Sequence, residues 1–343
     1  MSLIIPSIFL IIFGLFNLFG LNQELFFRQL LYSIIGLIGY FVVKSIGKHF
    51  FRVNIRLLYY FLLIALIVTF IIGIEARGSK RWLDFYFFRF QASEFFKPIF
   101  ALFLSQYLQS KDVFKNDLNL FLRSILYFFI PFIIIFKQPD LANSITFLVI
   151  YLVIIFFSKI PKKFLAIFSG ISVVFLPLLW FFIKDYQKDR IISFFNPHLD
   201  KQGIAYNMIQ SVITTGSGKF FGRGLGFGTQ SRLFFLPENT TDFAFASLVE
   251  QFGFFGGLVV ILLYSYLIFV VIKRAVTFFY ERNDEGWSNF LFSIGLLSYL
   301  VFQIFVNIGM NVGLLPVAGV ALPFISYGGS SVLAVLIAFA LLP

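Results

Sequence analysis

Residues 235–243 read Phe-Leu-Pro-Glu-Asn-Thr-Thr-Asp-Phe, and they end the one long polar stretch of the chain, which runs from Lys184 to Phe243. An apolar run begins directly afterwards, so Asp242 stands at the edge of that run. Ionisable groups at membrane depth are costly and usually mark a functional site. We therefore expect the other spans to be arranged around this carboxylate.

The composition is that of a protein that crosses a membrane several times. Of the 343 residues, 59% are hydrophobic and only 13% are charged, whereas soluble domains contain about 25% charged residues. Apolar runs of the roughly 20 residues that a bilayer requires recur along the chain. These features predict an all-α polytopic membrane protein.

The composition also excludes several kinds of site. There is no cysteine, so the chain has neither disulfides nor thiolate metal ligands. Two histidines, His49 and His198, are too few to form a histidine metal site alone. The net charge of +11 comes from basic residues dispersed over loops, a pattern typical of membrane topology and not of a nucleic-acid-binding surface.

We expect about ten transmembrane helices in a single domain, residues 1–343, with a large extracytoplasmic loop, residues 185–242, between helices 7 and 8. The first apolar run follows Met1 without a basic segment or a cleavage site, so a retained span is predicted. Within the loop, apolar residues recur at helical spacing over 204–213 and predict a short interfacial helix. The expected spans are residues 3–19, 25–46, 56–73, 91–109, 119–136, 140–157, 163–184, 243–272, 288–310 and 324–342.

Basic residues in alternate loops predict the orientation of the spans. The positive-inside bias makes one set of loops cytoplasmic and leaves both termini in the cytoplasm. The basic residues of this set are Lys44, Lys48, Arg52, Arg56, Lys111, Lys115, Lys159, Lys162, Lys163, Lys273, Arg274 and Arg282. Loop 74–90 departs from the rule, because Arg77, Lys80, Arg81 and Arg89 would lie on the other side. We interpret this excess as cations kept for a ligand.

Two places combine charges with an apolar span. Glu94 and Lys97 are three residues apart at the start of the fourth span, so they can form an ion pair. That pair would either fix helix packing or form the wall of a charged cavity. Asp140 follows Pro139 at the start of the sixth span, where capping of the helix is the simplest role.

The long loop contains a glycine-rich segment, residues 216–228, that also holds Lys219 and Arg223. It does not match a P-loop, because Phe220 stands where Ser or Thr is needed. A tight irregular turn and a phosphate cradle built from backbone N–H groups both remain open. Glu250 is predicted to lie at membrane depth, and Trp82 suits either an interfacial anchor or a substrate contact.

These motifs, taken in order, resemble the SEDS family of cell-wall polymerases, and its rod-shape branch, RodA, more than its division branch, FtsW. The resemblance covers nearly the whole chain. It departs at Thr240, where the family has His, at Gln251, where it has a second acid, and at Ala92, Ala142 and Asn143. The matching segments are residues 78–83, 89–97, 138–141, 206–211, 216–218, 222–224, 228–231, 235–238, 241–243, 307–310, 313–316 and 322–331.

The resemblance implies a peptidoglycan glycosyltransferase of the bacterial cytoplasmic (inner) membrane that polymerises lipid II during cell elongation. An α-linked diphosphate donor that becomes a β-1,4 linkage requires inversion by single displacement. Asp242 is expected to be the general base, with cations around the departing diphosphate. The expected substrate-binding residues are Lys80, Arg81, Trp82, Glu94, Lys97, Asp140, Lys219, Arg223 and Glu250.

A divalent cation, Mg or Mn, is a further expectation, as an ion that bridges Asp242 and the diphosphate. The resemblance also implies a class B penicillin-binding protein transpeptidase as partner, together with other elongation-complex membrane proteins. Two rival functions stay open: a lipid-linked sugar flippase, which needs a polar path across the bilayer, and a non-catalytic scaffold for the transpeptidase.

Overall fold

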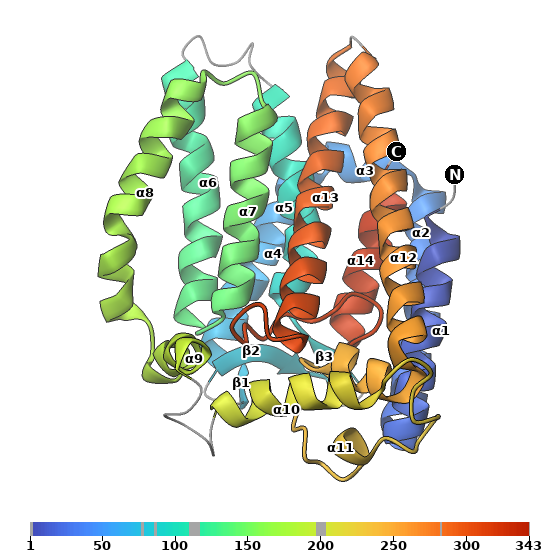
Figure 1. Cartoon of the computed structure of the whole chain (residues 1–343). Coiled ribbons are helices and arrows are strands. Elements are labelled where there is room, and N and C mark those ends of the chain that lie inside the picture. The colour runs from blue at the N-terminus through green and yellow to red at the C-terminus, as the bar shows by residue number, and fades with distance from the viewer. Residues whose placement is uncertain are drawn as a thin grey trace. The chain divides into compact units, whose positions relative to one another are not determined.

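In the computed structural model a helix occupies each of the ten predicted spans (Figure 1). The structure describes residues 3–76, 79–85, 88–109, 117–196, 204–281 and 283–342. Arg77, Lys111, Lys115, His198 and Arg282 lie outside these residues. The ten helices are α1 (Ile4–Leu21), α2 (Gln23–Ile46), α4 (Ile55–Ile72), α5 (Ala92–Gln109), α6 (Asp117–Lys137), α7 (Leu141–Phe157), α8 (Lys162–Phe182), α12 (Ala244–Tyr280), α13 (Asp284–Asn311) and α14 (Gly329–Leu341).

Among the described residues, six helices are long and apolar enough to cross a membrane: α1, α2, α4, α6, α12 and α13. The helices α7 and α14 are apolar but shorter. In α4, buried residues recur every three or four positions, at Tyr59, Leu62, Leu66 and Thr69, while most of its other apolar side chains are exposed. An exposed apolar face of this kind suits contact with lipid. The prediction of a polytopic helical fold is confirmed.

The chain forms two compact units. The first comprises Met1–Leu37, Lys184–Val270 and Val301–Leu333, and the second comprises Ile38–Ile183, Val271–Leu300 and Ala334–Pro343. Four further helices are short: α3 (Lys48–Val53) in the second unit, and α9 (Asp185–Phe195), α10 (Ile204–Ser217) and α11 (Thr229–Arg232) in the first. The interfacial helix predicted over 204–213 is α10, which continues to Ser217.

In the second unit, α5 is the central helix and packs against α4, α6 and α7. Most of its residues are buried, and its aromatic side chains form the core. Phe96 and Phe103 pack on Tyr59 of α4, with ring centroids 5.1 and 4.2 Å away. Phe147 of α7 lies 5.4 Å from Phe100. This packing fixes the first turns of α5, where Glu94 and Lys97 lie.

The loop predicted between α4 and α5 at residues 74–90 contains a three-stranded antiparallel sheet that the sequence did not indicate. Its order is β1 (Ile74–Ala76), β2 (Ser79–Asp84), β3 (Arg89–Phe90). Ile74 pairs with Trp82, and Leu83 pairs with Phe90. Cross-strand pairs of aromatic and aliphatic residues stabilise a sheet, but strands of two to six residues are too short to give a clear alternation in the sequence.

In the first unit, α12 is broken at Gly253, whose φ of 71° and ψ of −171° are not helical. Residues of the glycine-rich segment satisfy the backbone groups that this break exposes. The N–H groups of Arg223 and Gly224 donate to the carbonyls of Glu250 and Gln251, at 2.9 and 3.1 Å. In return, the N–H of Phe254 donates to Lys219 O at 2.8 Å. A broken helix is tolerated in a membrane when neighbouring chain satisfies its backbone.

The last span begins later than predicted, because α14 starts at Gly329 and not near residue 324. The backbone before it makes other hydrogen bonds. The N–H of Leu322 donates to Ser326 Oγ at 2.9 Å, and the N–H of Tyr327 donates to Thr240 O at 2.8 Å. Segment 322–328 is therefore fixed against the residues that precede Asp242.

Candidate active site

The backbone at Asp242 is held by a row of hydrogen bonds within the first unit. The carbonyl of Thr241 accepts from Ser326 Oγ at 2.6 Å. The carbonyl of Asp242 accepts from two amides of α13, Asn307 Nδ2 at 3.1 Å and Asn311 Nδ2 at 3.0 Å. With Thr240, three successive carbonyls are bound, so the position of Asp242 is determined by segments distant in sequence.

Asn311 connects this backbone to the start of α12. Its Oδ1 accepts from the N–H of Ala246 at 2.9 Å, one of the N-terminal amides that a helix leaves without an internal partner. The side chain is fully buried. The neighbouring residues Phe243, Ala246 and Met310 belong to one apolar cluster. Polar groups thus hold the backbone of Asp242, and a packed core begins at the next residue.

The half-buried carboxylate of Asp242 lies beside a cation that the sequence did not reveal, Arg190 of α9. A Cβ added to Gly319 would lie 3.3 Å from Arg190 Nη1 and 3.7 Å from Asp242 Oδ2. Both groups therefore approach one point above Gly319, and the distance between Nη1 and Oδ2 cannot exceed the sum of these two values. The only signal in the sequence is that Tyr186 and Arg190 are four residues apart in a polar run.

Glu250, predicted to bind substrate, is buried and accepts hydrogen bonds from the protein itself. Its Oε1 accepts from the N–H of Gln230 at 2.8 Å and from Ser217 Oγ at 3.4 Å. Its Oε2 accepts from the N–H of Ser231 at 2.9 Å and also from the Ser231 hydroxyl. This carboxylate ties the long loop to α12, so its observed contacts are structural.

Several backbone amides of the glycine-rich segment bond within the protein and are not open to a phosphate. The N–H groups of Arg223 and Gly224 are used at the break in α12, which favours the tight-turn interpretation over the phosphate cradle. The side chains of Lys219 and Arg223 are exposed. Arg223 Nε donates to Ser217 O at 3.3 Å.

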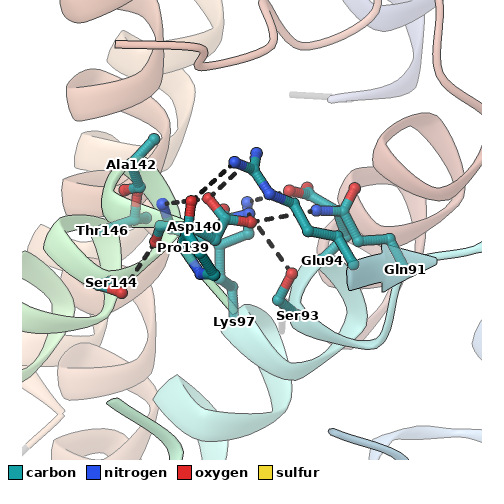
Figure 2. Close-up of polar contacts among 11 residues, drawn as sticks. Gln91, Ser93, Glu94, Lys97, Pro139, Asp140, Ala142, Ser144 and Thr146 are labelled. Carbon is teal, nitrogen blue, oxygen red and sulfur yellow. Dashed lines mark hydrogen bonds and ion pairs between the residues drawn. The ribbon is translucent and has the colours of Figure 1, made fainter. Parts of the chain in front are cut away.

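A second group of charges lies in the second unit, where α5 and α7 begin (Figure 2). Lys97 Nζ donates to Glu94 Oε1 at 2.7 Å, and both side chains are buried. The predicted ion pair is thus confirmed. The ammonium also lies 5.3 Å from the ring centroid of Tyr299, so Lys97 is held on two sides.

Asp140 caps α7, as predicted, by accepting from the N–H of Asn143 at 3.2 Å. Its carboxylate also faces Arg81 Nη1 at 3.6 Å, and Arg81 Nη2 donates to Pro139 O at 2.8 Å. Arg81 Nε and Glu94 Oε2 are buried, with no hydrogen-bond partner among the described residues. Buried polar atoms of this kind indicate a place where water or a ligand binds.

Two other predicted residues lie on β2 of the same unit. Lys80 is exposed and Trp82 is half-buried. The structure therefore brings Arg81, Glu94, Lys97 and Asp140 together in one cluster, whereas Asp242 and Glu250 have separate surroundings in the first unit.

The family model for the cell cycle proteins FtsW, RodA and SpoVE matches residues 3–343. The chain belongs to this family. Peptidoglycan glycosyltransferase MrdB of Escherichia coli K12 is 36% identical over 308 residues, 89% of this chain and 80% of MrdB. A chain of a solved peptidoglycan synthase complex matches with a TM-score of 0.81 and 24% identity, over 99% of this chain and 95% of that one. Rod shape determining protein RodA of Thermus thermophilus matches with a TM-score of 0.72 and 23% identity, over 99% and 94%.

The family motifs lie where the two charged regions are. In this FtsW/RodA/SpoVE family member, residues 79–83 lie on β2, residues 89–97 enter α5, and residues 138–141 lead into α7. Residues 241–243, 307–310 and 322–331 surround the backbone of Asp242. At Thr240, where the family has His, the carbonyl and not the side chain makes the contact with Tyr327.

A divalent cation fits the described residues only in part. No group of three His, Asp or Glu side chains among them is placed to hold a metal ion. Asp242 has a guanidinium beside it and could offer a metal one carboxylate. Because Mg²⁺ often takes its remaining ligands from water and substrate phosphates, a bound ion would supply charge to a diphosphate.

Proposed function

We propose that this protein is a peptidoglycan glycosyltransferase that polymerises lipid II into β-1,4 glycan strands, with Asp242 as its general base. The observation that carries the proposal is the rigid placement of one carboxylate beside one cation. Three carbonyls around Asp242 are hydrogen-bonded, and Arg190 and the Asp242 carboxylate approach one point above Gly319. The family membership and the name of the E. coli relative support the same activity.

The reaction requires few protein groups. The acceptor 4-hydroxyl attacks C1 of the donor sugar, its proton passes to Asp242, and the diphosphate leaves with the electrons of the C1–O bond. Diphosphate is already a good leaving group, so no acid has to protonate it. The protein must position the hydroxyl near a base and stabilise the negative charge that develops on the leaving group.

The charges of the second unit suit the binding of substrate more than proton transfer. Arg81 and Lys97 are paired with Asp140 and Glu94, so their positions are fixed before a substrate arrives. We propose that the free Nε of Arg81, together with Lys80, contacts the diphosphate, and that Trp82 packs against sugar or lipid. Lys219 and Arg223 are assigned to the lipid headgroup at the rim of the long loop.

The cellular setting follows from the same proposal. The protein works in the bacterial inner membrane with both termini in the cytoplasm, in cell elongation and rod-shape maintenance. Its partner is a class B penicillin-binding protein that crosslinks the new strand. The similarity to a chain of a peptidoglycan synthase complex supports this assembly. The divalent cation stays a proposal without a step assigned to it.

Incubation of the purified protein and its transpeptidase partner with lipid II in vesicles tests the proposal. We expect polymer that a muramidase digests, and no faster movement of lipid II between leaflets than in empty vesicles. Rapid movement of lipid II without polymer would identify a flippase. Polymer formation that depends only on the partner would identify a scaffold.

A further inference from the structure

We propose that Arg56 of α4 and Arg123 of α6 form a binding site for the headgroup phosphate of an anionic phospholipid. The site lies in the second unit and includes neither the candidate base nor the charged cluster at the starts of α5 and α7, so the inference goes beyond the proposed function. From that function it takes only the orientation of the chain, which places the starts of α4 and α6 in the cytoplasmic leaflet. Anionic headgroups give this leaflet a negative surface potential.

The helices α4 and α6 lie side by side and run in the same direction. Near their starts, the Tyr59 hydroxyl of α4 donates to the carbonyl of Tyr127 of α6 at 2.6 Å. Further along both helices, Gln138 Nε2, one residue past the end of α6, donates to Leu66 O of α4 at 3.1 Å. Residues that come earlier on α4 are therefore beside residues that come earlier on α6.

The two arginines occupy equivalent positions on these parallel helices. Arg56 lies one turn before Tyr60, and Arg123 lies one turn before Tyr127. The side chains of Tyr60 and Tyr127 are hydrogen-bonded to each other, and one turn advances a helix by only about 5.4 Å. Both guanidinium groups are also close enough to the Tyr107 hydroxyl, near the end of α5, to interact with it electrostatically. The two positive charges thus gather around one buried tyrosine.

This pair of charges borders the apolar surface that faces lipid. Both arginine side chains are exposed. Large apolar side chains next to them on the two helices are exposed as well, namely Leu57, Phe61, Leu122 and Leu126. A phospholipid matches both parts of this surface, because it joins a charged phosphate to acyl chains. An acidic soluble molecule would match the arginines alone.

Arginine and tyrosine have the chemistry for such a headgroup. A guanidinium keeps its charge and presents a planar set of N–H donors that can bind two phosphate oxygens at once. Tyrosine is favoured at the level of the headgroups, where its ring is in apolar surroundings and its hydroxyl is wet. A single arginine at this end of a span is an ordinary topology signal. Two arginines around one tyrosine can hold one phosphate from two sides.

A lipid titration of the purified full-length protein in a neutral detergent tests the inference. We expect phosphatidylglycerol to bind, as seen by native mass spectrometry, and to raise the unfolding temperature, whereas phosphatidylcholine should do so much less. Arg56→Gln/Arg123→Gln should weaken the apparent affinity for phosphatidylglycerol about tenfold or more, because charge-assisted hydrogen bonds are lost. Arg56→Lys/Arg123→Lys should keep part of the affinity.

The matched control is Lys163→Gln/Lys273→Gln. It removes the same number of charges from exposed positions at the same predicted side of the membrane, and it should bind phosphatidylglycerol like the wild type. A photoactivatable phosphatidylglycerol gives the position of the site. It should label residues 55–61 and 121–127 in the wild type and in the control, and label them weakly in Arg56→Gln/Arg123→Gln.

Three results would overturn the inference. The first is an equal loss of affinity in the lysine control, which would make net charge the only requirement. The second is labelling confined to other helices, and the third is equal stabilisation by inorganic phosphate at the same concentration. Unfolding of each variant without added lipid shows that it is folded. None of these measurements uses lipid II, so their failure leaves the proposed glycosyltransferase function standing.

Discussion

Asn311 is the residue on which the geometry of the candidate base most depends, because it bonds both to the carbonyl of Asp242 and to the N–H of Ala246. Asn311→Ala removes both bonds: the N–H of Ala246 loses its partner, and the carbonyl of Asp242 keeps only the bond from Asn307 Nδ2. A buried group left unsatisfied costs about 1–3 kcal/mol. We expect a lower unfolding temperature and slower lipid II polymerisation, whereas Asn119→Ala, at an exposed position of α6, should alter neither. Wild-type turnover in a folded Asn311→Ala variant would show that this anchor does not position Asp242.

The buried pair of Glu94 and Lys97 allows packing and function to be separated. Lys97→Met alone leaves the Glu94 carboxylate buried with its partner removed, at a cost of about 3–5 kcal/mol. The double variant Glu94→Gln/Lys97→Met removes both charges, so its thermal stability should exceed that of Lys97→Met. If the double variant is stable but does not polymerise lipid II, the pair serves the substrate. If it polymerises lipid II normally, the pair serves only packing.

Local spacing decided which site residues could be predicted. The pair Glu94–Lys97 and the cap at Asp140 are formed by residues three apart on one helix, so sequence alone indicates them. The approach of Arg190 and Asp242 to one point above Gly319 brings α9 near the start of α12 through the fold, and no sequence pattern encodes it. Glu250 was recognised as unusual, but its partners in the loop could not be foreseen.

At the scale of elements, the break in α12 explains the glycines of the long loop. A Cβ at Gly253 would lie 2.3 Å from Gly222 N and 2.4 Å from Phe220 O, closer than atoms approach. Its backbone conformation is also one that only glycine adopts without strain. For any other residue the strain costs about 1–3 kcal/mol. Gly253→Ala is therefore expected to lower the unfolding temperature and to increase hydrogen exchange over residues 218–224.

The control for this change is Gly39→Ala in α2, where an added Cβ meets nothing within 4 Å. That variant should be neutral or slightly more stable, since alanine favours a helix over glycine. Equal behaviour of the two alanine variants would contradict the role given to the break.

Elements were predictable where one signal dominated. A bilayer demands long apolar helices, and all ten predicted spans are helical. The sequence did not indicate the sheet within residues 74–90, because strands of a few residues give too little periodicity. The predicted span 324–342 began too early, because hydrogen bonds to residues 240–241 replace helical ones before Gly329. In both places, contacts formed by the fold outweigh local preference.

At the scale of the whole molecule, the proposed orientation can be tested with single cysteines, because the native chain has none. A cysteine at Thr229 of α11, which is exposed, should react with a membrane-impermeant maleimide added outside intact spheroplasts. A cysteine at Lys163, also exposed, should react only after lysis. Outside labelling at Lys163 would contradict the orientation derived from the basic loops.

The central claim concerns the chemistry of Asp242, and the turnover of Asp242→Asn measures it most directly. The asparagine keeps the size of the side chain and the backbone contacts, but it cannot accept the proton of the sugar hydroxyl. We predict that the folded variant, with its partner bound, still binds undecaprenyl diphosphate but polymerises lipid II about 10²–10⁴-fold more slowly. Polymerisation at the wild-type rate would contradict the account.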